Sequence, residues 1–273
     1  MTTDHISYSQ YSSYTSCPRS WYLSKVAKAE EKQTWYMPIG SAVHAMVESY
    51  LESAWPAPNY LSAESFFYPL IEKQMQVEPD LSKWMAGGPQ ADPIVGDKAL
   101  QLVKDCFERA LEFLDDIDVW EVEYDASGSL PGLPVPIKAY VDIIGEHREH
   151  GPTILDWKTG AKPKNAFQLE TYAALLEGKE WNFPGKPVQY KGLWALLKPG
   201  ASKARPIDLS SVDPAVVGAK YQEVYEKMQA KIYRTEMGFN CKFCFNQDNC
   251  LPVAGPTERA TYYDKAEEDG YPY

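Results

Sequence analysis

Three cysteines close to the C-terminus constrain the fold more than any other feature of the sequence. They form the pattern C-x2-C-x5-C, at Cys241, Cys244 and Cys250. Closely spaced thiolates are typical of a metal or metal-cluster site, which usually takes four of them. The fourth would come from Cys17 or Cys106. We favour Cys17, which lies at a junction between two expected helices, so the two ends of the chain should meet.

The spacing of the cysteines leaves the bound group open. Zinc and a [4Fe–4S] cluster both fit it, and a redox-active dithiol is a third reading that leaves the third cysteine without a role. Cys106 lies among apolar residues of an expected helix and is read as core packing. We see no secretory signal and no apolar run near the roughly 18–20 residues that span a membrane, so we expect a cytoplasmic protein without structural disulfides.

A second constraint is an apolar run, Thr153–Leu155, that ends in Asp156-Trp157-Lys158. In a strand, residues i and i+2 point to the same face, so Asp156 and Lys158 should project together. A carboxylate that holds a hard cation, beside a lysine that positions water, suits metal-assisted hydrolysis of a phosphodiester.

Another carboxylate, Asp142, interrupts the apolar run at residues 140–144. An acid in a central strand is costly unless it is paired or binds a metal. If the two runs form neighbouring antiparallel strands, Asp142 and Asp156 can reach one edge of a twisted sheet.

The net charge of −11 over 273 residues is at first sight wrong for an enzyme that acts on nucleic acid. The charge is uneven, however: residues 44–150 carry 20 acidic and seven basic side chains, whereas residues 151–205 carry nine basic and four acidic ones. Because the local field steers a polyanion, the segment around Asp156 is where we expect one to bind. The alternative is that these cations (Lys162, Lys164, Lys198, Lys203 and Arg205) form an ordinary solvated surface.

Hydrophobic periodicity predicts an α/β fold around a mixed sheet, with no internal repeat. The expected helices cover residues 7–16, 18–28, 38–51, 63–78, 97–118, 166–176 and 211–237, with a loop at 84–89. The expected strands cover residues 120–124, 135–145, 153–157, 188–197 and 204–209. We expect one domain over residues 1–254, in which 45–118 is a helical addition, and a flexible acidic tail over 255–273.

The order of these motifs resembles the RecB-like branch of the PD-(D/E)xK nucleases, with similarity to the CRISPR-associated RecB-type iron–sulfur exonucleases and the nuclease domain of AddB. The likeness spans about residues 7–252 and implies a restriction-endonuclease-like core of order αβββαβ. It is carried by His44 in G-x3-H, Glu121 or Glu123, Asp142, Asp156-x-Lys158, Gln168-x3-Tyr172, and Cys17 with the C-terminal cysteines.

The resemblance implies a role for each of these positions. His44, Asp142 and Asp156 would bind Mg2+ or Mn2+, with the carbonyl of Trp157 as a further ligand. Lys158 would orient the attacking water and stabilise charge at phosphorus.

The remaining positions also take their roles from the family. Gln168 and Tyr172 would support the site. Of the two acids on the first strand we favour Glu121 over Glu123, because of the aromatic Tyr124 that follows. The four cysteines, Cys17, Cys241, Cys244 and Cys250, would hold a structural [4Fe–4S] cluster.

The implied function is a metal-dependent DNA exonuclease that prefers single-stranded ends, acting in phage or bacterial recombination and repair or in a CRISPR-related process. Its partners would be DNA and other recombination or CRISPR proteins, in a monomer or an oligomer, with no membrane contact. Two alternatives remain: a catalytically idle DNA-binding or adaptation factor with the same fold, and a zinc-stapled interaction module.

Overall fold

A five-stranded mixed sheet forms the centre of the molecule, seen in a computed structural model that describes residues 4–53, 62–86, 93–179, 188–201 and 205–268. The sheet has the order β2-β4-β5-β6-β7, and a separate two-stranded sheet joins β1 to β3. Only β5 and β6 pair in parallel within the large sheet. The strands are β1 (Ile6–Ser7), β2 (Ile117–Asp125), β3 (Ile137–Lys138), β4 (Tyr140–His147), β5 (Gly151–Lys158), β6 (Lys191–Leu196) and β7 (Ile207–Asp208).

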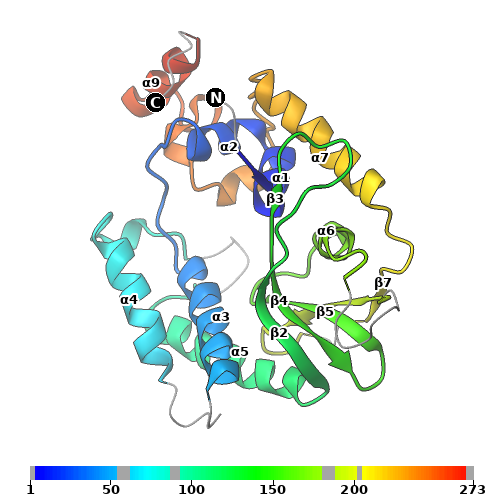
Figure 1. Cartoon of the computed structure of the whole chain (residues 1–273). Coiled ribbons are helices and arrows are strands. Elements are labelled where there is room, and N and C mark those ends of the chain that lie inside the picture. Colours follow the sequence, from blue (N-terminus) through cyan, green and yellow to red (C-terminus); the bar gives the residue numbers. More distant parts are fainter. Residues whose placement is uncertain (1–3, 54–61, 87–92, 180–187, 202–204, 269–273) are drawn as a thin grey trace.

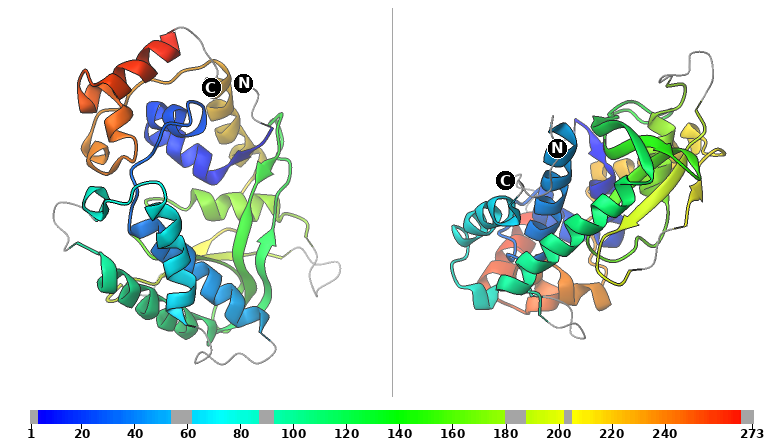
Figure 2. Two further views of the ribbon diagram at one scale, coloured as in Figure 1. Left: turned by 90° about the vertical axis from the view of Figure 1, so that its left-hand side faces the viewer. Right: turned by 90° about the horizontal axis from the view of Figure 1, so that it is seen from below.

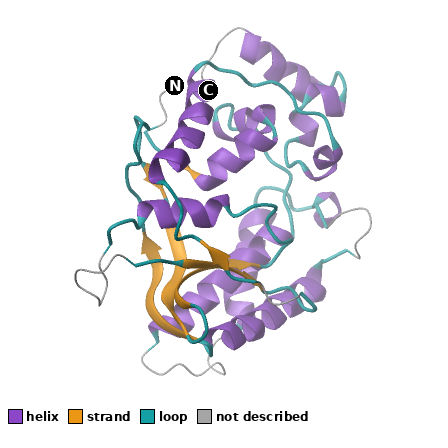
Figure 3. Ribbon diagram, turned by 90° about the vertical axis from the view of Figure 1, so that its right-hand side faces the viewer, coloured by secondary structure: helices purple, strands orange, loops and turns teal. Residues whose placement is uncertain are grey.

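Helices cover both faces of this sheet (Figures 1 and 3). The α-helices of the described residues are α1 (Tyr8–Ser16), α2 (Pro18–Lys25), α3 (Tyr36–Glu52), α4 (Ala63–Met75), α5 (Gly96–Leu114), α6 (Phe167–Leu175), α7 (Pro214–Gln229), α8 (Leu251–Ala254) and α9 (Glu258–Glu268). The parts of the chain that the structure describes contain no helix long and apolar enough to cross a membrane.

Alternation along the strands divides the apolar residues into two cores. Side chains on one face of the sheet pack with α3, α4 and α5, and they include Ile143, Leu155 and Leu193. Their chain neighbours on the other face pack with α1, α2, α6 and α7, and they include Ile144, Ile154 and Trp194. This arrangement confirms the predicted α/β class and mixed sheet, since strands buried on both faces need helices on both sides.

The N-terminal helices begin where the capping pattern predicts. The hydroxyl of Ser7 accepts a hydrogen bond of 3.2 Å from the backbone N–H of Gln10, which caps α1. Cys17 separates α1 from α2 in an extended conformation, and Pro18 takes the first position of α2. Pro fits there because the first turn of a helix leaves its N–H groups unpaired.

Several predicted boundaries are wrong. The helix predicted to Asp118 ends at Leu114, because residues 117–118 already belong to β2. The helix predicted to Met237 ends at Gln229, and Lys231 adopts a left-handed conformation (φ 54°) that cannot continue it. The strand predicted over 135–145 is divided into β3 and β4. The predicted loop at 84–89 and strand at 204–209 lie partly outside the described residues.

The predicted flexible tail is also wrong for the part that the structure describes, because Glu258–Glu268 form α9. A buried arginine of α2 holds this helix: Arg19 donates a hydrogen bond of 2.7 Å to Asp264 and contacts Glu267, while its guanidinium lies 5.1 Å from the Tyr22 ring centroid. The N- and C-terminal regions therefore lie side by side (Figures 1 and 2).

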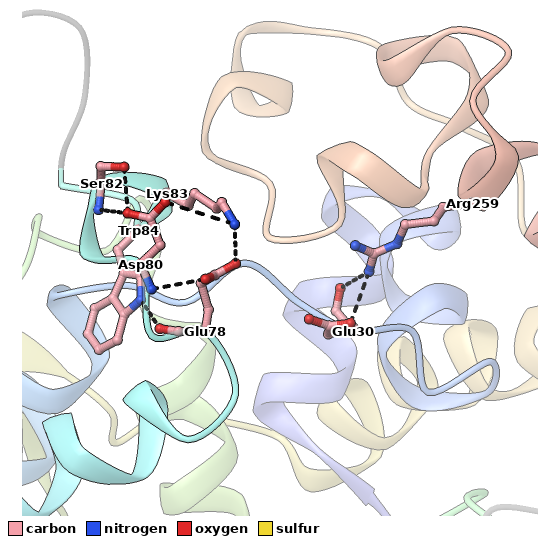
Figure 4. A network of polar contacts seen from close by, with 7 residues as sticks. All are labelled: Glu30, Glu78, Asp80, Ser82, Lys83, Trp84 and Arg259. Carbon is pink, nitrogen blue, oxygen red and sulfur yellow. Dashed lines mark hydrogen bonds and ion pairs between the residues drawn. The ribbon is translucent and has the colours of Figure 1, made fainter.

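A second, more exposed contact joins the same two regions. Arg259 of α9 lies 3.5 Å from the carboxylate of Glu30, and Figure 4 shows this pair close to the network around Glu78 and Lys83. Both side chains of the Arg259–Glu30 pair are about half exposed, so solvent screens their attraction.

We predict that Arg19→Ala releases α9. The variant leaves two carboxylates without their shared donor, so the free energy of unfolding should fall by about 2 kcal/mol. Limited proteolysis should then cut between α8 and α9. The matched control is Arg259→Ala, which should cost less than about 1 kcal/mol and leave α9 protected. Equal protease resistance of wild type and Arg19→Ala would contradict the assigned role of Arg19.

Candidate active site and metal centre

A histidine and two carboxylates from three elements meet at one end of the sheet. His44 comes from α3, Glu123 from β2 and Asp142 from β4. The Nδ1 atom of His44 lies 3.8 Å from Oε1 of Glu123 and 3.6 Å from Oδ1 of Asp142. One ligand atom from each residue lies within 4.8 Å of the others, and the described residues contain no other such group of three. Oxygen ligands with one imidazole suit Mg2+ or Mn2+.

The structure brings Glu123 of β2 into this group, and not Glu121, which we favoured from the sequence. The register Ile117–His147, continued without interruption, would place Val122 opposite Asp142. A β-bulge between Val119 and Glu121 adds one residue, and Glu123 takes that place instead. Glu121 pairs with Ile144, farther along β4.

Two backbone features accommodate this bulge. The first is Gly145, which lies against the backbone of Asp118. A Cβ atom at this position would be 2.5 Å from the Asp118 carbonyl oxygen, so a larger residue would clash there. Glu123 itself is the other: its φ of 46° falls in the left-handed region, which a non-glycine residue adopts at a cost of order 1–3 kcal/mol. Sequence alternation alone contains no signal for this bulge.

Asp142 and Asp156 lie where β4 and β5 stop pairing. The last paired residues are Ile143 and Leu155, and beyond them the strands diverge. The carboxylate of Asp142 spans the gap, since its Oδ2 accepts a hydrogen bond of 2.7 Å from the backbone N–H of Trp157. A buried side chain thus replaces a ladder hydrogen bond and is held in a fixed orientation.

Helix α3 approaches the end of β5 closely, and this brings His44 to the strands. The closest point is Gly40, where a Cβ atom would lie 3.3 Å from Oγ1 of Thr159. Since Gly40 lies one helical turn before His44, the absence of its side chain sets how near the imidazole comes.

Asp156 lies in a separate polar network beside the His44 group. It is buried, and its Oδ1 accepts hydrogen bonds of 2.6 Å from Gln168 and 3.3 Å from Tyr172, both on α6. Its Oδ2 contacts the ammonium of Lys158, which also donates a hydrogen bond of 3.2 Å to Gln168. Gln168 donates to the hydroxyl of Tyr172 at 2.7 Å. All four side chains were predicted from the sequence, and the structure brings them together.

Burial and mutual repulsion shift the titration of these acids. Burial, with the nearby charge of Asp156, raises the pKa of Asp142 to about 8. Burial also raises the pKa of Asp156, against the opposing effect of Lys158. Burial alone would lower the pKa of His44, but the neighbouring carboxylates of Glu123 and Asp142 outweigh it, so the net pKa is raised. Crowded carboxylates that resist ionisation are the usual surroundings of a bound cation.

The described side chains fit a divalent cation at this position. Oδ2 of Asp156 is buried, and its close partner is the ammonium of Lys158. His44 and Glu123 are each about one-third exposed, which leaves the group open to solvent on one side. The site therefore combines closely spaced oxygen ligands with access for a substrate and water.

The cysteines lie at a second site, between the N- and C-terminal regions. Cys17, Cys241, Cys244 and Cys250 all line one cavity of about 480 Å³, whereas Cys106 is buried within α5. No disulfide joins the five cysteines. Cys17 thus reaches the same cavity as three cysteines that follow it by more than 200 residues in the sequence.

The local contacts of these thiols are weak. The Cys244 sulfur lies 3.4 Å from the hydroxyl of Ser20, and the N–H of Gly238 donates to the Cys241 sulfur at 3.4 Å. Burial raises the pKa of the Cys250 thiol.

The spacing of the sulfurs bears on which group they could bind. Four thiolates around one zinc ion at about 2.3 Å lie about 3.8 Å apart. Among the described residues no three cysteine sulfurs lie within 4.8 Å of one another. A single zinc ion would require the sulfurs to move together, whereas a larger cluster would use the cavity between them.

Comparison with known proteins identifies the family. No curated protein sequence matches the chain. One similar solved structure is the crystal structure of SSO0001, with a TM-score of 0.36 and 15% sequence identity, covering 78% of this chain and 95% of that chain. A family model described as the PD-(D/E)XK nuclease superfamily matches residues 5–250. That match confirms the superfamily expected from the sequence: the chain belongs to the PD-(D/E)XK nuclease superfamily.

Proposed function

We propose that the protein is a metal-dependent DNA exonuclease of the RecB-like branch, acting on single-stranded ends. The observation that carries the proposal is the meeting of His44, Glu123 and Asp142 beside the Asp156–Lys158 pair. The superfamily supports metal-dependent nuclease activity. The choice of DNA, the exonuclease mode, a role in recombination, repair or a CRISPR-related process, and a single domain over residues 1–254 are inferred from the resemblance.

Mg2+ or Mn2+ bound here would supply positive charge where negative charge develops on the phosphodiester. His44, Glu123 and Asp142 would hold the cation, and Asp156 and the carbonyl of Trp157 would complete its ligands. Asp142 is already oriented by the Trp157 N–H.

Lys158 would act electrostatically on the attacking water and the phosphate. Gln168 and Tyr172 hold Asp156 and Lys158 in place through the hydrogen bonds described above. These two α6 residues are therefore assigned as positioning residues.

We also propose that Cys17, Cys241, Cys244 and Cys250 hold a [4Fe–4S] cluster. The convergence of the four side chains on one cavity supports a shared bound group, and because no three of the described sulfurs lie within 4.8 Å of one another, we favour a cluster over a zinc ion. Such a cluster would be structural, since it would join the two ends of the chain.

We predict that Lys158→Ala abolishes hydrolysis and preserves the fold. Loss of one stabilising cation from the reacting centre should reduce the rate by at least roughly 10²–10³-fold. End-labelled single- and double-stranded DNA, with Mn2+, Mg2+ or EDTA, measures this directly. Lys98→Ala, on the exposed part of α5, is the matched control and should cleave normally. A fully active Lys158→Ala would refute the assignment, and inactive, folded wild type would favour the idle binding factor.

We predict that metal-free stability falls as pH rises and that added metal reverses the loss. Asp142 has a folded pKa of about 8 against an ordinary value of 3.8, so the folded state retains a proton that the unfolded state releases. The free energy of unfolding should therefore decline between about pH 4 and pH 8, by up to about 1.4 kcal/mol per pH unit.

Thermal melts at several pH values, with EDTA or Mn2+, test this prediction. Stabilisation by Mn2+ should be larger at pH 9 than at pH 6, because below about pH 8 the cation competes with a proton on Asp142. Asp142→Asn should flatten the pH dependence in EDTA and abolish most of the Mn2+ effect. An Mn2+ effect that is independent of pH would contradict the role of Asp142.

We predict that Cys244→Ser removes a chromophore and lowers the melting temperature. Anaerobically purified wild type should be brown and contain iron and acid-labile sulfide in equal amounts, and the variant should lose all three properties. Cys106→Ser, which changes the cysteine outside the cavity, should keep them. Colourless, folded wild type that contains zinc would show that the bound group is a zinc ion.

A further inference from the structure

We propose that Tyr140 and Lys138 position the substrate strand next to the metal centre: Tyr140 stacks on an unpaired base, and Lys138 contacts a backbone phosphate. The inference rests on the proposed function and assigns residues that bind the strand rather than the reacting phosphate. Neither residue belongs to the motifs that mark the active site.

The strand backbone places both side chains in line with the active site. Ile137, Ala139 and Val141 are buried in the core that packs with α6 and α7, whereas Lys138 and Tyr140 between them are exposed. Lys138 and Tyr140 therefore project as a row from the opposite face, on which α3 packs and brings His44 to the site. The row ends two residues before Asp142, about 6.6 Å along the strand, which is comparable with the spacing of nucleotides in an extended strand.

The two side chains have the chemistry that binds single strands. Tyr140 is 45% exposed, although it is a large aromatic residue in the strand that carries a metal ligand. Lys138 is also exposed, and its Nζ atom lies 5.7 Å from the centroid of the Tyr140 ring. A cation beside an exposed aromatic ring is the combination with which proteins bind single-stranded nucleic acid without reading its sequence.

The acid directly opposite Tyr140 is Asp125, which pairs with it across β2 and β4. Its carboxylate accepts a hydrogen bond of 2.9 Å from the N–H of Ser127, and the charge of Lys138 acts on it favourably. Asp125 is thus partly neutralised, and Lys138 keeps one side of the row positive.

The position of the row favours unpaired DNA over a duplex. A tyrosine ring can stack on a base only when that base face is not covered by its neighbour in a duplex. β4 and β3 extend from the sheet toward α1 (Figure 1). A DNA strand bound by Tyr140 and Lys138 would therefore leave the metal centre along β4 and β3. Tyr140 and Lys138 therefore favour DNA whose end is already single-stranded.

The first test measures binding without cleavage, in the Lys158→Ala background with Mg2+, by fluorescence anisotropy of a labelled single-stranded oligonucleotide and the matching duplex. Adding Tyr140→Ala should weaken binding of the single strand by roughly 5- to 150-fold, and Tyr140→Phe should retain it. Tyr68→Ala is the matched control, because Tyr68 is 44% exposed on the distant helix α4. Lys138→Ala should lower the salt dependence by about one phosphate contact, whereas Lys73→Ala should not.

The second test uses the active enzyme. Tyr140→Ala should raise KM for single-stranded DNA while kcat stays within about twofold, because the residue binds the strand and does not touch the reacting phosphate. Unchanged binding by Tyr140→Ala, in a wild type that cleaves normally, would overturn this inference and leave the proposed function intact. An equal loss for single strand and duplex would overturn the stacking role. Wild type that neither binds nor cleaves DNA would overturn the proposed function itself.

Discussion

The hydrogen bond from the Trp157 N–H to Asp142 is the interaction on which the site depends. It lies where β4 and β5 stop pairing, so that a side chain takes over from the backbone ladder. Were the two strands to remain paired past Leu155, Asp142 could not accept this bond. The divergence of two strands therefore creates the site, and the carboxylate at their junction is oriented before any ligand binds.

The cost of this arrangement is a set of buried acids. Asp142 and Asp156 are both almost fully buried, and burial opposes their ionisation. Lys158, Gln168 and Tyr172 satisfy Asp156 within the protein, whereas Asp142 has the partly exposed His44 and Glu123 for neighbours. This asymmetry distinguishes the two acids: Asp156 is held by the lysine, whereas Asp142 lies beside the two partly exposed side chains.

Much of this site could be predicted from the sequence because its motifs are local. The D-x-K pair follows from strand alternation, and Gln168 and Tyr172 lie four residues apart on one helix, so neither depends on long-range register. The choice of Glu123 over Glu121 could not be made from the sequence, because the bulge before Glu121 shifts the pairing of two strands by one residue. The ends of α5 and α7 were also missed, since the start of β2 and the left-handed Lys231 override helical periodicity. The tail was misread because α9 is held by Arg19, a residue almost 250 positions away.

The cavity between the two ends of the chain also bears on the order in which the protein can fold. Cys17 leaves the ribosome more than 200 residues before Cys241, Cys244 and Cys250. Closing a loop of this length costs about 5 kcal/mol of chain entropy, and the contacts that offset it can form only after the C-terminal cysteines have been made. The apolar side chains of α2, including Trp21 and Leu23, must therefore wait for the C-terminal region before their burial is complete. A chain that terminates early would keep its nuclease motifs and lose the means to cover its own N-terminus.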